Sequence, residues 1–459
     1  MLLRGRRQIF SSVSEVTTEN LPGVLRKAFL IHEQNRREEL YLHKMYRGKQ
    51  DVLYRTKEVR PEINNKITEN HAYEITEFKK GYQFGEPVQY VQRGKCDIHG
   101  ADGEESAVSY LNELMQDDYK QTKDTELGEW LFATGHAYRM VLPGDDDIPF
   151  ETYIPFAPNT FVVYSSDFRH RPLLGVTYCI RDDGQKEATV YSKDTCWLVC
   201  GDEVQKPSPH VLGQVPIIEY VANPSRIGCF EPVIPMLNAL NAIASDRMDG
   251  IDQFIQSLMK FINCDIDPET FRELKELGAI KITSTDQKRA DVEVMTNELN
   301  QTQVQTLVDY TYQMILTICG VPDRRASAGG NTGQALIIGQ GWTMAEANAR
   351  QVDQMYRRSE REFLKLVLRI LRDTTSVPVA LQKLNLSDID IKFSRNRTDN
   401  LLVKTEAMLN QLNAGVHPRI AISSVGLYSD PEQVWNDSQE YMGKWKVDKD
   451  ANNTAASGE

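Results

Sequence analysis

The stretch EPVIPMLNALNAIASDRMDGIDQFIQSLMKFI, residues 231–262, decides the fold of this chain. Apolar residues recur in it at helical spacing, and Pro232 stands in the first turn, where proline is tolerated. One continuous helix over this stretch would be about 45 Å long. A compact body rarely needs a rod of that length, so the pattern predicts a helix that projects from the rest of the molecule.

The sequence that follows predicts a small α+β unit and then a second long helix. DPETFRELKELG (267–278) has Asp267 as helix cap, Pro268 at the first position and Gly278 as stop. AIKIT (279–283) and DVEVM (291–295) are expected strands. Asn300 can then cap a helix over 301–319. Two long helices would therefore present a small unit at their shared end.

A loop rich in glycine, GVPDRRASAGGNTGQALIIG (320–339), interrupts the helical pattern after Cys319. A phosphate-binding loop needs a lysine after its last glycine and a preceding strand, and this loop has neither. Helical spacing resumes from Thr332 to Asp373, with a kink expected at Gly339 and Gly341. The basic run 350–372, interleaved with Glu360 and Glu362, is expected to form a mixed solvent-exposed and inter-subunit face.

The remaining segments predict an α+β protein. Helices are expected over 21–48, from Pro61 to Gly81, and over 106–134. The stretch 136–221 is rich in β-branched and aromatic residues between turns and predicts antiparallel strands. A strand at 388–396 and helices over 401–441 complete the pattern. The N-terminal MLLRGRRQIFSS lacks the apolar core of a secretory signal and is expected to be a short flexible arm.

Composition excludes several functional classes. The chain has 459 residues with 41% hydrophobic and 26% charged residues, as in soluble globular proteins. Its net charge of −12 disfavours a protein whose task is to bind free DNA, and no apolar run is long enough to cross a membrane. The seven cysteines show no zinc spacing, and the pair in CWLVC (196–200) is expected to stay reduced.

Candidate metal and catalytic residues are few. Asp145, Asp146, Asp147 and Glu151 could hold a divalent cation through oxygen ligands, but a solvated acidic turn fits this spacing better. No arrangement of residues supports catalysis, so we expect no enzymatic activity and no cofactor.

The order of these parts resembles the portal proteins of long-tailed double-stranded DNA phages of Gram-positive hosts. The similarity is carried by NNKITENHAYEITEFKKGYQFGEPVQY, GQVPIIEYVANPSRIGCFEPVIPMLNALNAIASD, AIKITSTDQKRADVEVMTNELNQ, CGVPDRRASAGGNTGQALII, DIDIKFSRNRTDN and GLYSDPEQVW. It implies an elongated fold that assembles as a ring. Its parts would be an N-terminal arm and helix (1–45), a wing (46–230), a stem helix (231–262), a clip (263–298), a second stem helix (299–319), a channel loop (320–332), a long kinked helix (333–375), a returning wing strand (376–400), crown helices (401–445) and a disordered tail (446–459).

The resemblance also implies a function. Portal proteins form a ring, typically a dodecamer, at one capsid vertex. The terminase large subunit packages double-stranded DNA through the ring, which later retains the DNA, seats a head–tail adaptor and releases the DNA. Scaffold and major capsid protein would be further partners, and the location would be the host cytoplasm during assembly and then the virion, with no membrane involved.

Two sets of site residues follow from the resemblance. The DNA-facing channel loop would contain Asp323, Arg324, Arg325, Ser327, Gly329, Gly330, Asn331 and Thr332. The clip would contact terminase or adaptor through Asp267, Glu269, Arg272, Lys281, Lys288 and Arg289. An acidic lumen would repel the DNA backbone, and 264–300 has nine Asp or Glu against five Lys or Arg.

Two questions stay open at this point. The arginine pair at 324 and 325 could contact phosphates, or it could form salt bridges with Asp323 or with an acid of a neighbouring subunit. The alternative functions are a phosphate-handling enzyme that uses the glycine-rich loop and another structural protein of the head–tail connector.

Overall fold

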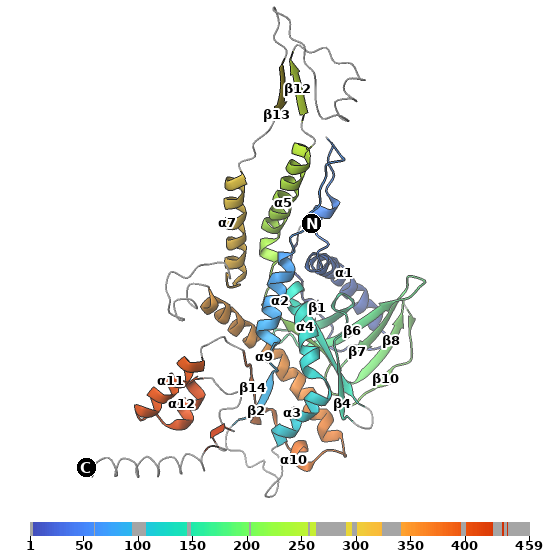
Figure 1. Ribbon diagram of the computed structural model, residues 1–459. Helices are drawn as coiled ribbons and strands as arrows, with labels where there is room; N and C mark the ends of the chain where they lie inside the picture. The colour runs from blue at the N-terminus through green and yellow to red at the C-terminus, as the bar shows by residue number, and fades with distance from the viewer. Residues whose placement is uncertain are drawn as a thin grey trace, which may run out of the picture.

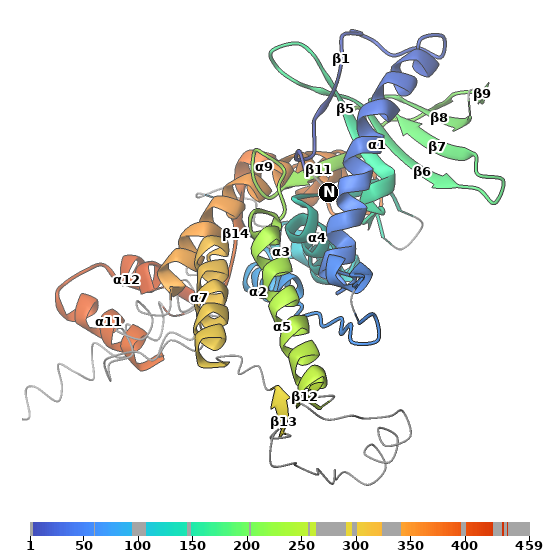
Figure 2. The ribbon, with the colours of Figure 1, turned by 90° about the horizontal axis from the view of Figure 1, so that it is seen from above.

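The computed structural model describes residues 3–58, 60–93, 107–144, 148–201, 203–255, 258–262, 291–295, 301–323, 341–395 and 401–425, with 434, 435 and 438. Helices and sheets form a body from which two helices, α5 and α7, project side by side, as Figures 1 and 2 show. A two-stranded sheet lies beyond the ends of these helices. The fold is therefore a mixed helix and sheet structure with an elongated projection.

The projection differs from the expected helix 231–262. A 3-10 turn (Glu231–Val233) leads into α5 (Ile234–Ile255), and the helix ends there. Strand β12 (Leu258–Ile262) follows and pairs antiparallel with β13 (Asp291–Met295). The prediction of a helix that continues to residue 262 is wrong. The apolar segment LMKFI suits a helix or a strand, and it forms a strand because DVEVM supplies the backbone hydrogen-bond partners. The second helix, α7 (Gln301–Cys319), agrees with its predicted range.

Strands from 136 to 221, together with the N-terminal strand β1, form two sheets. The larger has the order β1-β5-β6-β7-β8-β10, with β9 paired to β8. Its strands are Ile9–Ser11, Thr160–Ser165, Pro172–Ile180, Lys186–Tyr191, Thr195–Cys200, Glu203–Val204 and Ser208–Pro209. The smaller has the order β11-β3-β4, with strands Ile217–Val221, His136–Pro143 and Phe150–Tyr153.

Helix α1 (Leu21–Tyr46) covers one face of the larger sheet and buries Leu21, Val24 and Ala28 against it. Strand β1 pairs in parallel with β5, so Ile9 lies opposite Val163. The prediction of a flexible N-terminal arm is therefore wrong from Ile9, where β1 begins. A three-residue strand is too short to be recognised locally, and its backbone partner lies about 150 residues away in sequence.

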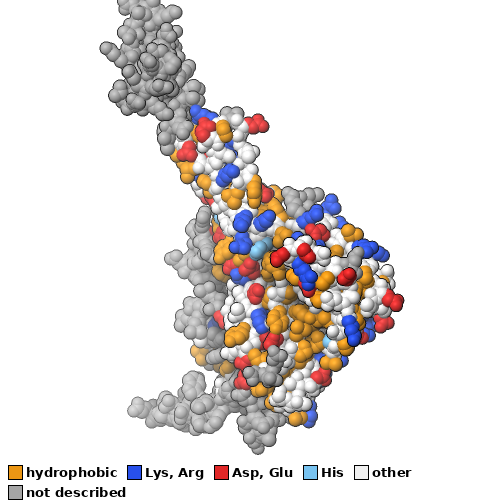
Figure 3. Space-filling view, turned by 90° about the vertical axis from the view of Figure 1, so that its right-hand side faces the viewer, with side chains coloured by type: hydrophobic (Ala, Val, Ile, Leu, Met, Phe, Trp, Pro, Cys, Tyr) orange, Lys and Arg blue, Asp and Glu red, His pale blue; other side chains and the backbone are white. Residues whose placement is uncertain are grey.

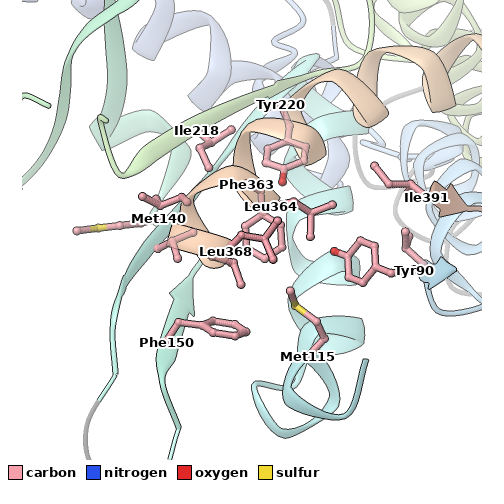
Figure 4. Close-up of a cluster of buried hydrophobic side chains, with 14 of the residues drawn as sticks. Tyr90, Met115, Met140, Phe150, Ile218, Tyr220, Phe363, Leu364, Leu368 and Ile391 are labelled. Atoms are coloured by element: carbon pink, nitrogen blue, oxygen red, sulfur yellow. The ribbon is translucent and has the colours of Figure 1, made fainter. Parts of the chain in front are cut away.

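The main core lies between the smaller sheet and α9 (Trp342–Asp373). Figure 4 shows Phe363, Leu364 and Leu368 of α9 pointing among Ile218 and Tyr220 of the sheet. Further elements that complete this body are α3 (Ala107–Asp117), α4 (Lys120–Thr134), α10 (Val379–Gln382) and the pair β2 (Gln89–Gln92) and β14 (Ile389–Lys392). Helices α11 (Leu401–Asn413) and α12 (Pro418–Val425) lie to one side of α9 (Figure 1).

One expectation about α9 is wrong, and a second fails at one residue, because the basic residues of the run 350–372 are exposed but Glu360 is not. Gly341 has φ of +82°, a left-handed conformation, so the helix begins at Trp342 and does not continue through Gly341 from Thr332. Glu360 is 0% exposed, not part of a solvated face. It accepts hydrogen bonds from Tyr90 (2.5 Å) and Tyr220 (2.6 Å), and Lys120 and Arg139 lie within ion-pair distance. Burial of a carboxylate needs such partners, and they come from elements distant in sequence.

The sequence pattern predicted a helix that starts at Pro61. Helix α2 (His71–Phe84) begins ten residues later. Asn70 caps it by accepting a hydrogen bond from the backbone nitrogen of Tyr73, at 3.2 Å. Gly81, the expected stop, lies inside the helix. Residues 61–63 form a turn, and residues 64–70 lie in neither a helix nor a strand. Another helix binds the backbone nitrogens of Asn65, Ile67 and Glu69, as described next.

Candidate stem and loop neck

A row of polar side chains on α5 holds the segment before α2. Asn241, Ser245 and Asp249 are spaced four residues apart and lie on one face of the helix. Their oxygens accept hydrogen bonds from alternate backbone nitrogens: Glu69 at 2.8 Å, Ile67 at 3.0 Å and Asn65 at 2.7 Å. The three side chains are buried. This polar ladder attaches the body to the base of the projecting helix.

Two cations reinforce the end of the ladder. Lys57 and Arg55 both contact the Asp249 carboxylate, and Arg55 also pairs with Asp246. Burial acts to raise the pKa of Asp249, but the hydrogen bonds from Lys57 and Asn65 outweigh it and hold that pKa below its usual value. The carboxylate therefore stays charged at neutral pH and keeps accepting these bonds.

A second polar contact joins α2 to α7. The His71 ring lies 4.7 Å from the Tyr312 ring, and its nitrogens face Glu74 (2.9 Å) and Glu69 (3.3 Å). Tyr312 donates to Glu74 at 2.9 Å. Burial lowers the pKa of His71, but the two carboxylates outweigh it and raise that pKa overall. The contact is strongest with a protonated imidazole.

Apolar side chains close the space between these polar contacts. Leu237 and Leu240 of α5 pack with Ile315 and Leu316 of α7, all nearly fully buried. Across the helices, Arg247 donates to Gln305 at 3.0 Å. The lower halves of α5 and α7 thus form one packed unit with α1 and α2.

The N-terminal arm ties the body to the start of this unit. The Arg6 side chain is fully buried and pairs with Glu231, at the base of the projection, and with Glu38 of α1 at 3.4 Å. Its Nε atom donates to the Arg226 carbonyl at 2.9 Å. Sequence reasoning missed this role, and no local pattern around Arg6 signals it.

Helix α7 ends where the sequence predicts. Gly320 has φ of +65°, and the backbone nitrogens of Val321 and Gly320 donate to Leu316 (2.9 Å) and Thr317 (3.1 Å). This is a Schellman motif, in which a left-handed glycine satisfies the last carbonyls of a helix.

The two ends of the glycine-rich loop meet beside α9. A Cβ atom on Gly320 would lie 2.0 Å from Nδ2 of Asn348, and one on Gly341 would lie 3.9 Å from Cα of Pro322. The chain therefore leaves α7 and enters α9 at one place, which we call the loop neck (Gly320–Asp323 and Gly341). The segment that joins Asp323 to Gly341 therefore begins and ends at neighbouring points of the structure.

Most predicted site residues lie outside the described part of the chain. Asp323 belongs to the loop neck, whereas Arg324, Arg325, Ser327, Gly329, Gly330, Asn331 and Thr332 fall beyond it. All six clip residues, Asp267, Glu269, Arg272, Lys281, Lys288 and Arg289, also fall outside. The polar ladder was missed by sequence reasoning, although its four-residue spacing was readable.

The outer face of α7 carries apolar side chains without cover. Leu307, Tyr310 and Ile318 are 53%, 62% and 50% exposed and lie opposite the buried residues of the helix. On α5, Met248 and Ile251 are also exposed. Exposed apolar side chains repeated along one helix face are typical of a surface that a partner covers.

A family model, described as "Phage portal protein, SPP1 Gp6-like", matches residues 27–455. The chain belongs to this family. It is a portal protein, and the family is one of structural proteins of the phage particle rather than of enzymes. The alternative of a phosphate-handling enzyme has no support from this match.

The portal has no match among curated proteins. Two similar solved structures are chains titled "Neck of empty GTA particle computed with C6 symmetry" and "Virion of native gene transfer agent (GTA) particle". They are 13% and 12% identical, with TM-scores of 0.46 and 0.44. Each comparison covers 86% of the portal and 94% of the other chain.

The described residues contain no group of three or more His, Cys, Asp or Glu side chains placed to hold a metal ion. Within the same residues, no helix has the length and hydrophobicity to cross a membrane.

Proposed function

We propose that this portal assembles as a ring of about twelve subunits at one capsid vertex. Terminase drives double-stranded DNA through its channel, the ring retains and later releases the DNA, and a head–tail adaptor docks on it. Scaffold and major capsid protein meet it during assembly in the host cytoplasm. The observation that carries the proposal is the uncovered apolar face of α7, because a ring of identical subunits covers the same face on each copy.

The parts of the structure take roles within this proposal. Helices α5 and α7 are the stem, and the strands β12 and β13 begin the clip. The two sheets with α2 to α4 form the wing, α1 is the N-terminal helix that precedes it, and α11 and α12 lie in the crown. The loop neck aims the channel loop, and the six clip residues are proposed contacts for terminase or adaptor.

Native mass spectrometry with negative-stain images tests the ring. We expect the wild-type portal to form closed rings with a central hole. Leu307→Lys and Ile318→Lys place charges on the uncovered face and should yield smaller species. Gln313→Lys, also exposed on α7 but polar in the wild type, is the matched control and should still form rings. A wild-type protein that stays a discrete monomer at high concentration would contradict the proposal.

The arginine pair has two candidate roles in the channel loop. Either Arg324 and Arg325 contact DNA phosphates, or they form salt bridges with Asp323 or with a neighbouring subunit. A packaging assay separates them. If the pair contacts DNA, Arg324→Ala and Arg325→Ala should alter packaging while leaving ring mass and thermal stability unchanged. If the arginines are structural, stability or ring mass should fall as well.

A further inference from the structure

The outer side of α9 carries a row of cations. In the C-terminal half of this helix, exposed basic side chains recur every three or four residues over about 21 Å. Two acids accompany them: Glu362, which pairs with Lys365 at 2.6 Å, and Asp373 at the end of the helix. The charge of this face is therefore positive, although the chain carries −12 overall. We call the row the basic stripe (Arg358, Arg361, Lys365, Arg369 and Arg372).

The arginines of the basic stripe have no carboxylate partner among the residues that the structure describes. Arg361 and Arg369 form no hydrogen bond or ion pair within that part of the chain. Arg372 donates to Oδ1 of Asn385, a neutral acceptor, at 3.2 Å. The Arg369 guanidinium lies against the backbone of Gly213, where a Cβ atom would approach Nη1 to 2.0 Å. Arginines that are held at a surface without acids are available to an acidic or aromatic partner.

The basic stripe and the outer side of α4 lie on opposite flanks of the body. Helices α4 and α9 face each other through Asp124 and Tyr356, whose hydroxyl donates to the carboxylate at 2.8 Å. With 3.6 residues per turn, the basic stripe lies on the side of α9 opposite Tyr356. By the same count, Glu126 and Glu129 lie on the side of α4 opposite Asp124. One flank of the body is therefore basic, and two carboxylates mark the other.

An aromatic pocket lies on the α4 flank. It encloses about 670 Å³ between α1, α2 and α4. The His43 ring stacks on Trp130 with centroids 4.4 Å apart, and the Tyr46 ring stacks on Tyr73 at 5.4 Å. Tyr73 is 49% exposed, so aromatic surface is open to a partner. The residues that line the aromatic pocket are His43, Tyr46, Arg47, Asn70, Tyr73, Glu129 and Trp130.

The α4 side of the aromatic pocket is acidic. Glu129 lines the pocket, and Glu126 lies one turn earlier on the same side of α4. Burial, and then the charge of Glu129, raise the pKa of Glu126. One cation, Arg47, also lines the pocket, and Lys123, which lies near Glu126, already pairs with Asp118 at 2.6 Å. A further cation beside the two carboxylates would therefore be stabilised.

We propose that the basic stripe of one subunit docks on the α4 flank of its neighbour, with an arginine of the stripe inserted into the aromatic pocket. A guanidinium stacks on aromatic rings and pairs with carboxylates, which are the groups that the pocket presents. A ring of identical subunits joins opposite flanks of successive copies, so the same contact repeats at every interface. The inference rests on the proposed function, because it requires subunits arranged in a ring.

Charge reversal on each flank tests the contact. One full-length variant carries Arg361→Glu and Arg369→Glu, and a second carries Glu126→Arg and Glu129→Arg. Each variant alone places like charges at every contact, so its ring fraction in native mass spectrometry should fall about tenfold. When the two variants are mixed, each presents the charge that the other needs. Rings that hold equal numbers of both variants should therefore return.

The matched control reverses two cations elsewhere. Lys27→Glu with Arg37→Glu changes two exposed residues of α1 and should leave ring formation at the wild-type level. Figure 3 views the side of α1 and the larger sheet, where Lys and Arg side chains are interspersed with Asp and Glu side chains. A wild type without rings would refute the proposed function together with this contact. Wild-type rings that persist in both reversed variants, or that mixing does not restore, would overturn the contact alone.

Cross-linking locates the contact with milder changes, which keeps the test valid if charge reversal disturbs folding. Arg361→Cys and Glu129→Cys are combined in one chain and treated with a bifunctional maleimide. Because the two positions lie on opposite flanks, a link between them joins two subunits, and we expect a ladder of linked oligomers up to the full ring. Neither single variant should give this ladder. Rings of the double variant that yield no ladder would overturn the proposal.

Discussion

The Asp249 carboxylate accepts hydrogen bonds from both nitrogens of Asn65, from the backbone at 2.7 Å and from the side chain at 2.9 Å. This contact closes the polar ladder and holds the segment before α2 along α5. Removal of this buried carboxylate leaves several hydrogen-bond donors without their acceptor. Asp249→Ala should therefore lower the free energy of unfolding by about 2–3 kcal/mol. Urea unfolding followed by fluorescence measures this change, with Asp252→Ala, one turn away, as a milder comparison.

The shifted pKa of the Asp249 carboxylate should make the stability of the protein depend on pH. Its pKa is lower in the folded protein than in the unfolded chain, so its stabilisation is present above about pH 4 and is lost as the pH falls toward the folded value. Asp249→Asn should therefore lose less stability between pH 5 and pH 3 than the wild type. Equal acid sensitivity of the two proteins would argue against a charged ladder.

His71 should show the opposite pH dependence. Its pKa is raised in the folded protein by Glu74 and Glu69, so its stabilisation is full below the unfolded pKa of about 6.5 and is lost as the pH rises through the folded pKa. His71→Gln should cost about 1 kcal/mol at pH 5.5 and clearly less at pH 9. Thermal unfolding at both pH values measures the difference, and an NMR titration of the imidazole would show no upward shift if the interpretation is wrong.

Glu360 and Glu362 provide a matched pair on one helix. Glu360 is buried with Lys120, Arg139, Tyr90 and Tyr220. Glu360→Ala leaves the two buried cations with only the Asp124 carboxylate between them and should cost about 3–5 kcal/mol. Glu362 is half exposed and pairs with Lys365, and its replacement by alanine should cost less than about 0.5 kcal/mol. Similar costs for the two variants would contradict the buried network.

Arg6 and Arg7 give a second matched pair. Arg6→Ala removes a buried guanidinium from Glu38 and Glu231 and should destabilise the protein by about 3 kcal/mol. Arg7 is exposed, and its backbone bond to Asn35 survives truncation, so Arg7→Ala should change stability by less than about 0.5 kcal/mol. Protease cleavage within the first ten residues should rise in Arg6→Ala alone.

The close approach of Gly320 to Asn348 at the loop neck can be tested by replacing glycines with alanine. Gly320→Ala and Gly415→Ala both strain a left-handed residue, at a cost of about 1–2 kcal/mol. A Cβ on Gly320 would also strike Asn348, whereas a Cβ on Gly415 meets open space. Gly320→Ala should therefore be the more destabilising, and Asn348→Ala should recover part of the difference. Additive effects of the two changes would show that Gly320 and Asn348 do not constrain each other.

Local signals in the sequence determined the elements whose cause is local. The apolar spacing of α7 and the glycine after Cys319 defined a helix and its stop, because a left-handed cap needs only neighbouring carbonyls. The strands between residues 136 and 221 followed from β-branched and aromatic composition. The order of the segments was sufficient to indicate the portal family, which the match over residues 27–455 confirms.

Tertiary structure alone decided the elements whose backbone or charge is satisfied from far away. LMKFI became a strand because β13 pairs with it, and residues 64–69 stayed outside the helix because α5 accepts their hydrogen bonds. Glu360 could be buried because two cations and two tyrosines from other segments surround it. Helical or polar patterns in sequence report what a segment prefers in isolation. A buried polar group or an unpaired backbone must instead find a partner, and only the folded chain supplies one.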